Sequence, residues 1–137
     1  MQTEVNEAKA TAFGEKLVGE LSTMLFGNLV YIGEKLGLFN LLAQSDAVTS
    51  EELAEKSSYQ PRYLREWLSA MTAAGWVEYD AETRRFRLPP EHASFLADAN
   101  NPMYVGGAME MIGSYGGVLP KIIECFRYGG GVGSDVL

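Results

Sequence analysis

Apolar residues recur at three- and four-residue steps from Phe13 to Leu36, which predicts a long amphipathic helix. Acidic and basic side chains, among them Glu15 and Lys16, fall on the other face. Gly37 follows the last apolar position and predicts the helix end, because glycine readily takes the left-handed conformation of a C′ residue. A short second helix is expected just beyond it. The apolar stripe of this helix consists of Phe13, Leu17, Leu21, Met24, Leu25, Ile32 and Leu36.

Two further helices are predicted between residues 49 and 75. Residues 49–52 read Thr-Ser-Glu-Glu, a capping box in which Thr49 and Glu52 satisfy each other's backbone N–H groups. Pro61 suits the first turn of the next helix, where its missing N–H is no loss. Gly75 is the expected C′ residue of that helix. Its predicted apolar face consists of Tyr63, Leu64, Trp67, Leu68 and Met71.

A β-hairpin is predicted after this helix. Val77 and Tyr79 alternate with polar residues, residues 80–83 form a turn, and Phe86 and Leu88 alternate again. Helix, turn, helix and hairpin in this order predict a winged helix-turn-helix. The expected fold class is therefore mainly α, a three-helix bundle plus a two-stranded wing, with flanking N- and C-terminal helices.

The last third of the chain is predicted to be helical and rich in glycine and methionine. A short helix over 91–98 precedes one that starts at Pro102, and Pro120 is expected to open a last helix. The glycine run over 129–133 indicates a linker, because a phosphate-binding glycine loop follows a strand and precedes a helix. The predicted units are N-terminal helices (1–45), a winged-helix core (46–92), C-terminal helices (93–128) and a glycine-rich linker (129–137).

Composition and charge narrow the function. The 137 residues are 47% hydrophobic and 21% charged, typical of a globular domain. The net charge of −7 excludes a generic polyanion binder, so DNA binding would need a local patch. Five of the six arginines lie within 58–88, but four acidic residues lie among them. The residues that would contact DNA are Arg62, Arg65, Arg84, Arg85 and Arg87.

No catalytic or metal-binding constellation is evident in the sequence. The single histidine, His92, is interpreted as a structural or surface residue. The single cysteine, Cys125, is interpreted as a small core residue. The longest uncharged run, 21–33, is too short to span a membrane. The acidic N-terminus does not look like a signal peptide, so a cytoplasmic location is the default expectation.

Several stretches together resemble the N-terminal region of a bacterial group of class I S-adenosylmethionine-dependent methyltransferases. They are residues 36–39, 49–54, 61–68, 74–80, 85–93 and 126–132. The resemblance implies a winged helix that dimerises through its helices and caps the substrate side of a Rossmann-like catalytic domain. It assigns dimerisation to residues 1–45 and capping to residues 93–128, and it makes residues 129–137 a linker toward a catalytic domain that is absent here. The glycine loop and the acidic ribose ligand of that domain have no counterpart here. Catalytic, cofactor and metal residues are therefore all expected to be absent, and the methyl donor is expected only in a full-length protein.

The expected partners follow from these observations. A homodimer is predicted through the stripe Phe13, Leu17, Leu21, Met24 and Leu25, which is too apolar for the little protein available to cover it. Under the resemblance, the candidate substrate cap is Met103, Met109, Met111 and Tyr115. A small-molecule substrate is expected only with a catalytic domain, and neither DNA nor a membrane is expected as a partner. The alternative hypothesis is a freestanding winged-helix regulator that binds DNA.

Overall fold

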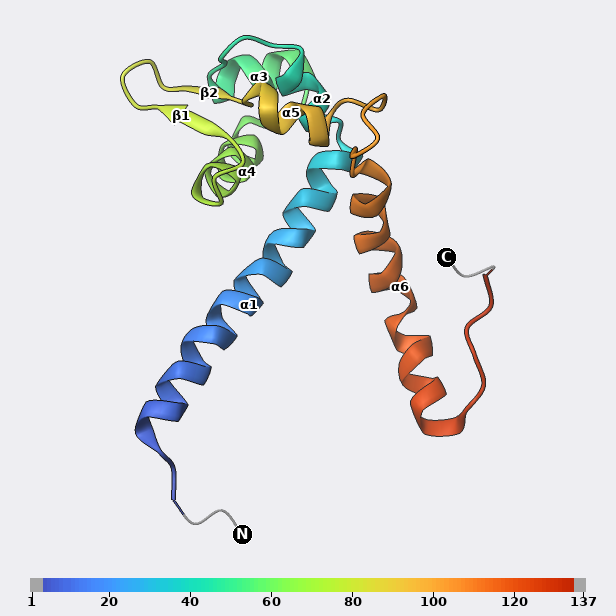
Figure 1. The fold of residues 1–137 in the computed structure, drawn as a ribbon. Helices are drawn as coiled ribbons and strands as arrows, with labels where there is room; N and C mark the ends of the chain where they lie inside the picture. Colours follow the sequence, from blue (N-terminus) through green and yellow to red (C-terminus); the bar gives the residue numbers. More distant parts are fainter. Residues whose placement is uncertain (1–3, 135–137) are drawn as a thin grey trace.

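The computed structural model describes residues 4–134, which form a helical head and two long helical arms (Figure 1). The head spans residues 30–96, and the arms are α6 and the part of α1 that precedes Val30. The elements are α1 (Glu7–Lys35), α2 (Leu38–Ala43), α3 (Ser50–Ser57), α4 (Pro61–Ala73), β1 (Glu78–Asp80), β2 (Arg85–Arg87), α5 (Pro90–Leu96) and α6 (Gly106–Tyr128). The mainly α winged helix-turn-helix predicted from the sequence is confirmed.

Local signals set the helix ends of the head. The Thr49 hydroxyl accepts a hydrogen bond from the Glu52 N–H at 3.1 Å, and the Glu52 carboxylate accepts one from the Thr49 N–H at 3.1 Å. This is the predicted capping box. Gly37 and Gly75 both have left-handed backbones, with φ of 68° and 79°, as expected after a helix end. Pro61 lies in the first turn of α4.

The wing is a two-stranded antiparallel hairpin in which Tyr79 pairs with Phe86. Phe86 also forms a β-bridge with Val48, through hydrogen bonds of 2.9 and 2.7 Å between their backbone groups. The segment that leads into α3 is therefore tied to the wing. This link places the start of α3 beside β2 although the two are far apart in the sequence.

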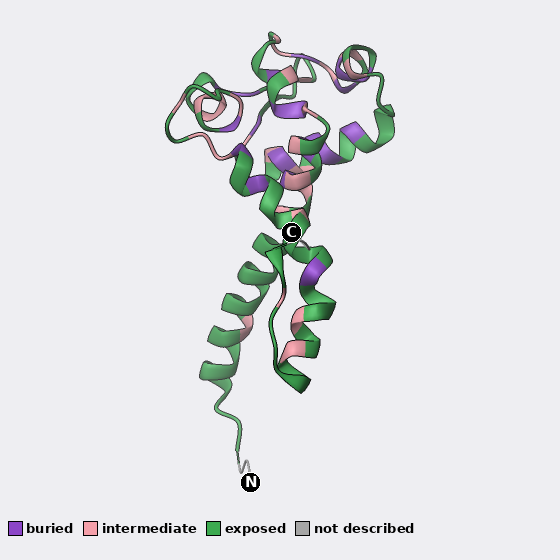
Figure 2. Cartoon of the chain, turned by 90° about the vertical axis from the view of Figure 1, so that its right-hand side faces the viewer, coloured by how far each residue is buried: buried purple, intermediate pink, exposed green. Residues whose placement is uncertain are grey.

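The hydrophobic core lies in the head, where buried positions concentrate, whereas the arms are almost wholly exposed (Figure 2). The largest fully buried side chains come from α2, α3 and α4. They are Phe39, Leu38, Leu53, Leu68 and Met71. Val30 of α1, Leu96 of α5 and Met109 of α6 join the same cluster, so each arm is rooted in this core.

A close approach of backbone to aromatic rings joins α1 to the head. Gly33 is buried, and a Cβ atom there would lie 2.9 Å from the Phe39 ring and still closer to Trp67. The Trp67 indole N–H donates a hydrogen bond of 2.9 Å to the Leu29 carbonyl oxygen. The ring centroids of Phe39 and Trp67 lie 5.3 Å apart in an edge-on arrangement. Only glycine fits at position 33.

The two arms contact each other where they leave the head. Gly113 of α6 lies directly against the ring of Tyr31, so the missing side chain allows the two helices to approach closely. Just before α6, the Tyr104 hydroxyl donates a hydrogen bond of 3.1 Å to the Glu34 carboxylate. Beyond these contacts the arms diverge (Figure 1).

The prediction for the start of the last helical region is wrong. No helix starts at Pro102, and α6 begins at Gly106. The Asn101 carboxamide holds the intervening turn, since it accepts from the Met103 N–H at 2.9 Å and donates to the Ser94 carbonyl at 2.7 Å. In a helix from Pro102 the Val105 N–H would donate to the Asn101 carbonyl, but it donates instead to the Phe95 carbonyl at 3.0 Å.

Two other helix details also differ from the predictions. Pro120 does not open a helix but lies inside α6, where it removes one N–H from the backbone ladder. The carbonyl that its ring crowds belongs to Gly116, four residues earlier in α6. Tyr63 is 73% exposed and is not part of the buried face of α4. The buried face contains Leu64, Trp67 and Met71 at i, i+3 and i+7 spacing. Tyr63 precedes Leu64 by one residue, so its side chain lies at the edge of this face.

We expect the Gly33→Ala variant to lower the free energy of unfolding by about 1–3 kcal/mol, because the methyl group would overpack the rings of Trp67 and Phe39. Urea unfolding followed by far-ultraviolet circular dichroism measures this change. Gly107→Ala is the matched control, since nothing lies within 4 Å of a Cβ at that helical position. The control should unfold with unchanged or slightly higher stability. A Gly33→Ala variant as stable as the wild type would contradict the packing described.

Candidate functional site

The predicted dimer stripe lies on the α1 arm and is open to solvent. Its five side chains, Phe13, Leu17, Leu21, Met24 and Leu25, are 39–67% exposed. Val18 and Ile32, at 65% and 43%, widen the apolar surface. The sequence pattern did not single out Val18, because it falls at the edge of the helical period. Within residues 4–134, no other element covers this surface.

A groove of about 690 Å³ lies where α1 passes α4. Apolar residues of α1, including Leu25 and Phe26, form one wall, and small residues of α4 form the other. Trp76 closes the groove, and its ring meets Phe26 edge-on at 5.0 Å between centroids. The sequence analysis did not anticipate this groove. Its sequence signal is the repetition of alanine at positions 70, 73 and 74.

The four residues of the candidate substrate cap do not share one environment. Met109 is buried in the core, whereas Met103, Met111 and Tyr115 are 64%, 47% and 48% exposed. Met109 and Met111 are two positions apart on α6 and so face opposite sides of the helix. The apolar surface extends farther along α6 than the sequence reasoning proposed. It includes Leu119, Ile123 and Phe126.

Two of the wing arginines are held by acidic neighbours. The Arg85 guanidinium donates to both oxygens of the Glu52 carboxylate, at 2.7 and 2.9 Å, and to the Ala47 carbonyl at 2.9 Å. The Arg87 guanidinium donates to Glu78 across the hairpin at 3.0 Å. Pairing leaves these two arginines little free charge for an external phosphate.

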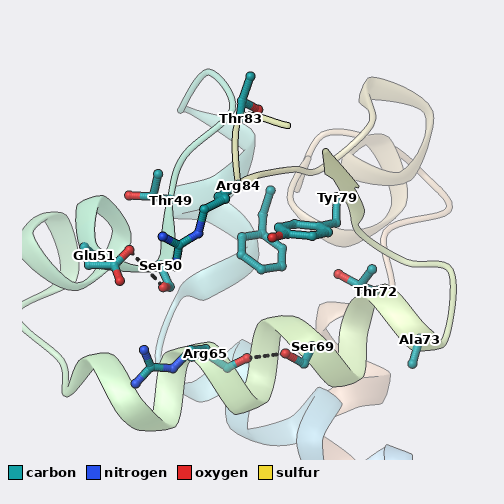
Figure 3. A pocket seen from close by; sticks show the side chains of 11 residues that line it. Thr49, Ser50, Glu51, Arg65, Ser69, Thr72, Ala73, Tyr79, Thr83 and Arg84 are labelled. Atoms are coloured by element: carbon teal, nitrogen blue, oxygen red, sulfur yellow. Dashed lines mark hydrogen bonds between the residues drawn. The ribbon is translucent and has the colours of Figure 1, made fainter. Parts of the chain in front are cut away.

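The other three arginines, Arg62, Arg65 and Arg84, are exposed and form no salt bridge within residues 4–134. Arg65 comes from α4 and Arg84 from the turn of the wing, and both line one groove (Figure 3). Arg62 lies one turn earlier on α4 and does not line it. The structure therefore divides the five arginines into a paired and an unpaired set.

His92 and Cys125 take no part in a reactive cluster. His92 Nδ1 lies 2.8 Å from the Trp76 carbonyl oxygen, which is a structural contact. Cys125 is half-buried on α6, outside the core to which the sequence analysis assigned it. In the described part of the chain, no group of acidic, histidine or cysteine side chains is arranged to hold a metal ion. None of the described helices has the length and apolarity needed to cross a membrane.

The sequence of residues 25–98 matches the family described as the Rv2258c-like winged HTH domain. The match covers more than half of the chain, and the chain belongs to this family. It includes the root of α1, the whole head and all of α5. No curated protein matches the chain.

Several solved structures with a similar fold are methyltransferases, matched over their N-terminal part. Mitomycin 7-O-methyltransferase MmcR superposes with a TM-score of 0.72 at 18% identity, over 90% of this chain and 36% of that one. The dimethyltransferase RosA from Streptomyces davawensis gives 0.72 at 22% identity, over 85% and 34%. CalO1, a methyltransferase of calicheamicin biosynthesis in its SAH-bound form, gives 0.63 at 16% identity, over 98% and 38%. The chain thus spans about a third of their length.

Glu52 links the cap of α3 to the wing, and this makes stability sensitive to acid. The pKa of its carboxyl is lowered from the ordinary 4.5 by the hydrogen bonds from Arg85 and then by the Thr49 N–H. The ionised carboxylate therefore stabilises the fold above the pKa of the unfolded chain, and this contribution is lost as the pH falls through the lower folded-state pKa.

We expect Glu52→Gln to be less stable than the wild type at neutral pH and to lose less stability between about pH 5 and pH 3. Urea unfolding at several pH values measures both effects. Glu55→Gln, an exposed position on the same helix, is the control and should keep the wild-type acid response. Equal acid sensitivity of Glu52→Gln and wild type would show that the Glu52–Arg85 pair does not act in this way.

Proposed function

We propose that this chain is the dimerisation and substrate-capping portion of an S-adenosylmethionine-dependent methyltransferase. The observation that carries the proposal is the pair of unpartnered apolar arms in a chain that, arms included, matches the N-terminal third of methyltransferases. Two apolar helices exposed to water are unfavourable for a domain of this size unless other protein covers them. In this proposal a second copy and a catalytic domain supply that cover.

The dimer uses α1 and the groove beside α4. Full burial of one leucine or phenylalanine side chain is worth about 1.5–3 kcal/mol of free energy. A monomer with this stripe exposed therefore lacks several kcal/mol of stabilisation that burial would provide. A protein domain is stable by only about 5–15 kcal/mol, which makes this a large fraction. Side chains of a partner's α1 fit the groove between α1 and α4, where alanines of α4 leave room.

The cap uses the outer face of α6. Met111 and Tyr115 are exposed on this face, and Met103 is exposed in the turn before α6. Methionine side chains adapt to substrates of different shape. Met109 contributes indirectly, because its burial roots α6 in the core of the head. Residues 129–137 would then link α6 to the catalytic domain of a full-length protein, which would hold the methyl donor.

A DNA-binding regulator is the second candidate, and the unpaired Arg62, Arg65 and Arg84 are the observation in its favour. Affinity for DNA scales with the number of phosphates that cations neutralise. Because Arg85 and Arg87 are bound to Glu52 and Glu78, only three of the five candidate arginines remain for this task. The match to methyltransferases extends over 85–98% of this chain, arms included, and favours the methyltransferase proposal.

We expect the wild-type chain to be a dimer and Leu21→Glu to be a monomer, because the new carboxylate would be buried in the seam without a partner. Sedimentation at several concentrations measures the state of each. Ala12→Glu is the matched control, since Ala12 precedes Glu15 and Lys16 by one turn on the polar face of α1. It should remain dimeric. Circular dichroism checks that Leu21→Glu keeps its fold, and a wild type that is monomeric at high micromolar concentration would refute the dimer.

We also expect that this 137-residue chain does not bind S-adenosylmethionine with micromolar affinity. Donor binding in this class of enzyme uses a glycine-rich turn between a parallel strand and a helix. In residues 4–134 the strands form a single antiparallel hairpin instead. Titration calorimetry with the donor tests this, and micromolar binding would assign the chain an activity of its own.

A further inference from the structure

A second surface lies away from the arms, in the groove that separates α3, α4 and the wing (Figure 3). Its volume is about 700 Å³, which suits one small organic molecule. The start of α3, the middle of α4 and both strands of the wing contribute to its walls. Its lining includes Glu51, Arg65, Ser69, Tyr79, Arg84 and Phe86.

An aromatic pair forms one wall of this groove. Tyr79 and Phe86 are cross-strand neighbours, with ring centroids 4.6 Å apart and ring planes tilted by 36°. Phe86 is buried by its neighbours, whereas Tyr79 keeps 45% of its surface exposed and points into the groove (Figure 3). An exposed aromatic face of this kind offers a stacking surface to another planar ring.

Two arginines face the groove from opposite elements. Arg65 projects from α4 and Arg84 from the wing, and Glu51 of α3 lies near both. The pKa of the Glu51 carboxyl is lowered by its own backbone N–H and by the Ser50 hydroxyl, and further by the charges of Arg84 and Arg65. With two cations and one carboxylate, the lining carries a net charge of +1. An anion is therefore favoured in the groove.

Arg84 has a backbone conformation that an arginine rarely adopts. Its φ is +57°, in the left-handed region that hairpin turns usually fill with glycine or asparagine. The neighbouring Arg85 is anchored on Glu52 and Ala47, so the turn is held in place whatever occupies position 84. An arginine here gives up local stability, and in return it sets a guanidinium group over the groove. Such outliers cluster at functional positions.

Polar side chains along α4 offer hydrogen-bond acceptors to a ligand in the groove. The Ser69 and Thr72 hydroxyls donate to the carbonyl oxygens of Arg65 and Leu68, both at 2.8 Å. Their protons are used inside the helix, so toward the groove these oxygens act as hydrogen-bond acceptors. A ligand with a hydroxyl or amino group on its ring would match them.

We propose that this groove binds a small aromatic carboxylate, with the ring against Tyr79 and the carboxylate between Arg65 and Arg84. Charge-assisted hydrogen bonds from two guanidinium groups would hold the anion, and the aromatic wall would select a planar body. A DNA backbone fits this surface less well, because Glu51 lies within it and the other wing arginines are paired. The site is separate from the arms and does not depend on the proposed methyltransferase role.

The test is a titration of the isotope-labelled 137-residue chain with 2-naphthoate, followed by chemical-shift changes in amide NMR spectra. The expected shifts centre on residues of the groove. Arg65→Gln and Arg84→Gly should each weaken binding by about tenfold, the loss of one charge-assisted hydrogen bond. Glycine is chosen at 84 because it suits the backbone there. Glu51→Gln should tighten binding, since it removes the opposing charge.

Two controls make the result specific. Arg62→Gln removes an exposed arginine of α4 outside the groove and should leave the affinity within about twofold of wild type. The neutral analogue 2-naphthamide should bind at least about tenfold more weakly than 2-naphthoate, since it lacks the charge.

Four outcomes would overturn the proposal. They are no binding of 2-naphthoate at millimolar concentration, equal binding of the amide, shifts confined to α1 and α6, and insensitivity to both Arg65→Gln and Arg84→Gly. A duplex oligonucleotide that displaces 2-naphthoate at physiological salt, and that fails to bind Arg84→Gly, would also overturn it. That result would identify the groove as a phosphate-binding track.

Discussion

The rest of the structure depends on the packing of Trp67 against α1. Gly33 has no side chain, so the ring packs directly on the helix backbone, and the indole N–H reaches the Leu29 carbonyl. This one arrangement fills the centre of the core and sets the direction in which α1 leaves it. The α1 arm is therefore an extension of the head rather than a separate helix, and its exposed stripe is presented at a defined angle.

The arms differ from the head in how little of their apolar surface they bury. The apolar side chains of the head are buried among α2, α3, α4 and the wing (Figure 2). Helix α1 buries its apolar residues only where it joins the head, and α6 does so there and at Val118. Glycines, including Gly113, bring the arms together at the root. The winged-helix framework is thus used as a rigid base, and the helices that flank it provide the contacts proposed for a second copy and a catalytic domain.

Electrostatic pairing within the head divides its arginines into a paired set and an unpaired set. Glu52 has two partners, because it closes the capping box with Thr49 and also binds Arg85 of the wing. The pairing holds the wing against α3 and cancels part of the positive charge. Arg65 and Arg84 are left over, and they converge on one groove from different elements. A uniform basic face is absent from the described residues, which favours a compact anion over an extended one.

The sequence by itself determined the elements whose signals are local. Each of these signals involves residues only a few positions apart, so the sequence alone predicts it. They are the capping box at 49–52, the helix ends at Gly37 and Gly75, and the hairpin. The exposure of Tyr63, the passage of α6 through Pro120 and the burial of Met109 were decided by the tertiary structure. So were the pairing of Arg85 with Glu52 and the meeting of Arg65 with Arg84, since these contacts join residues on different elements, and spacing along the chain does not encode them.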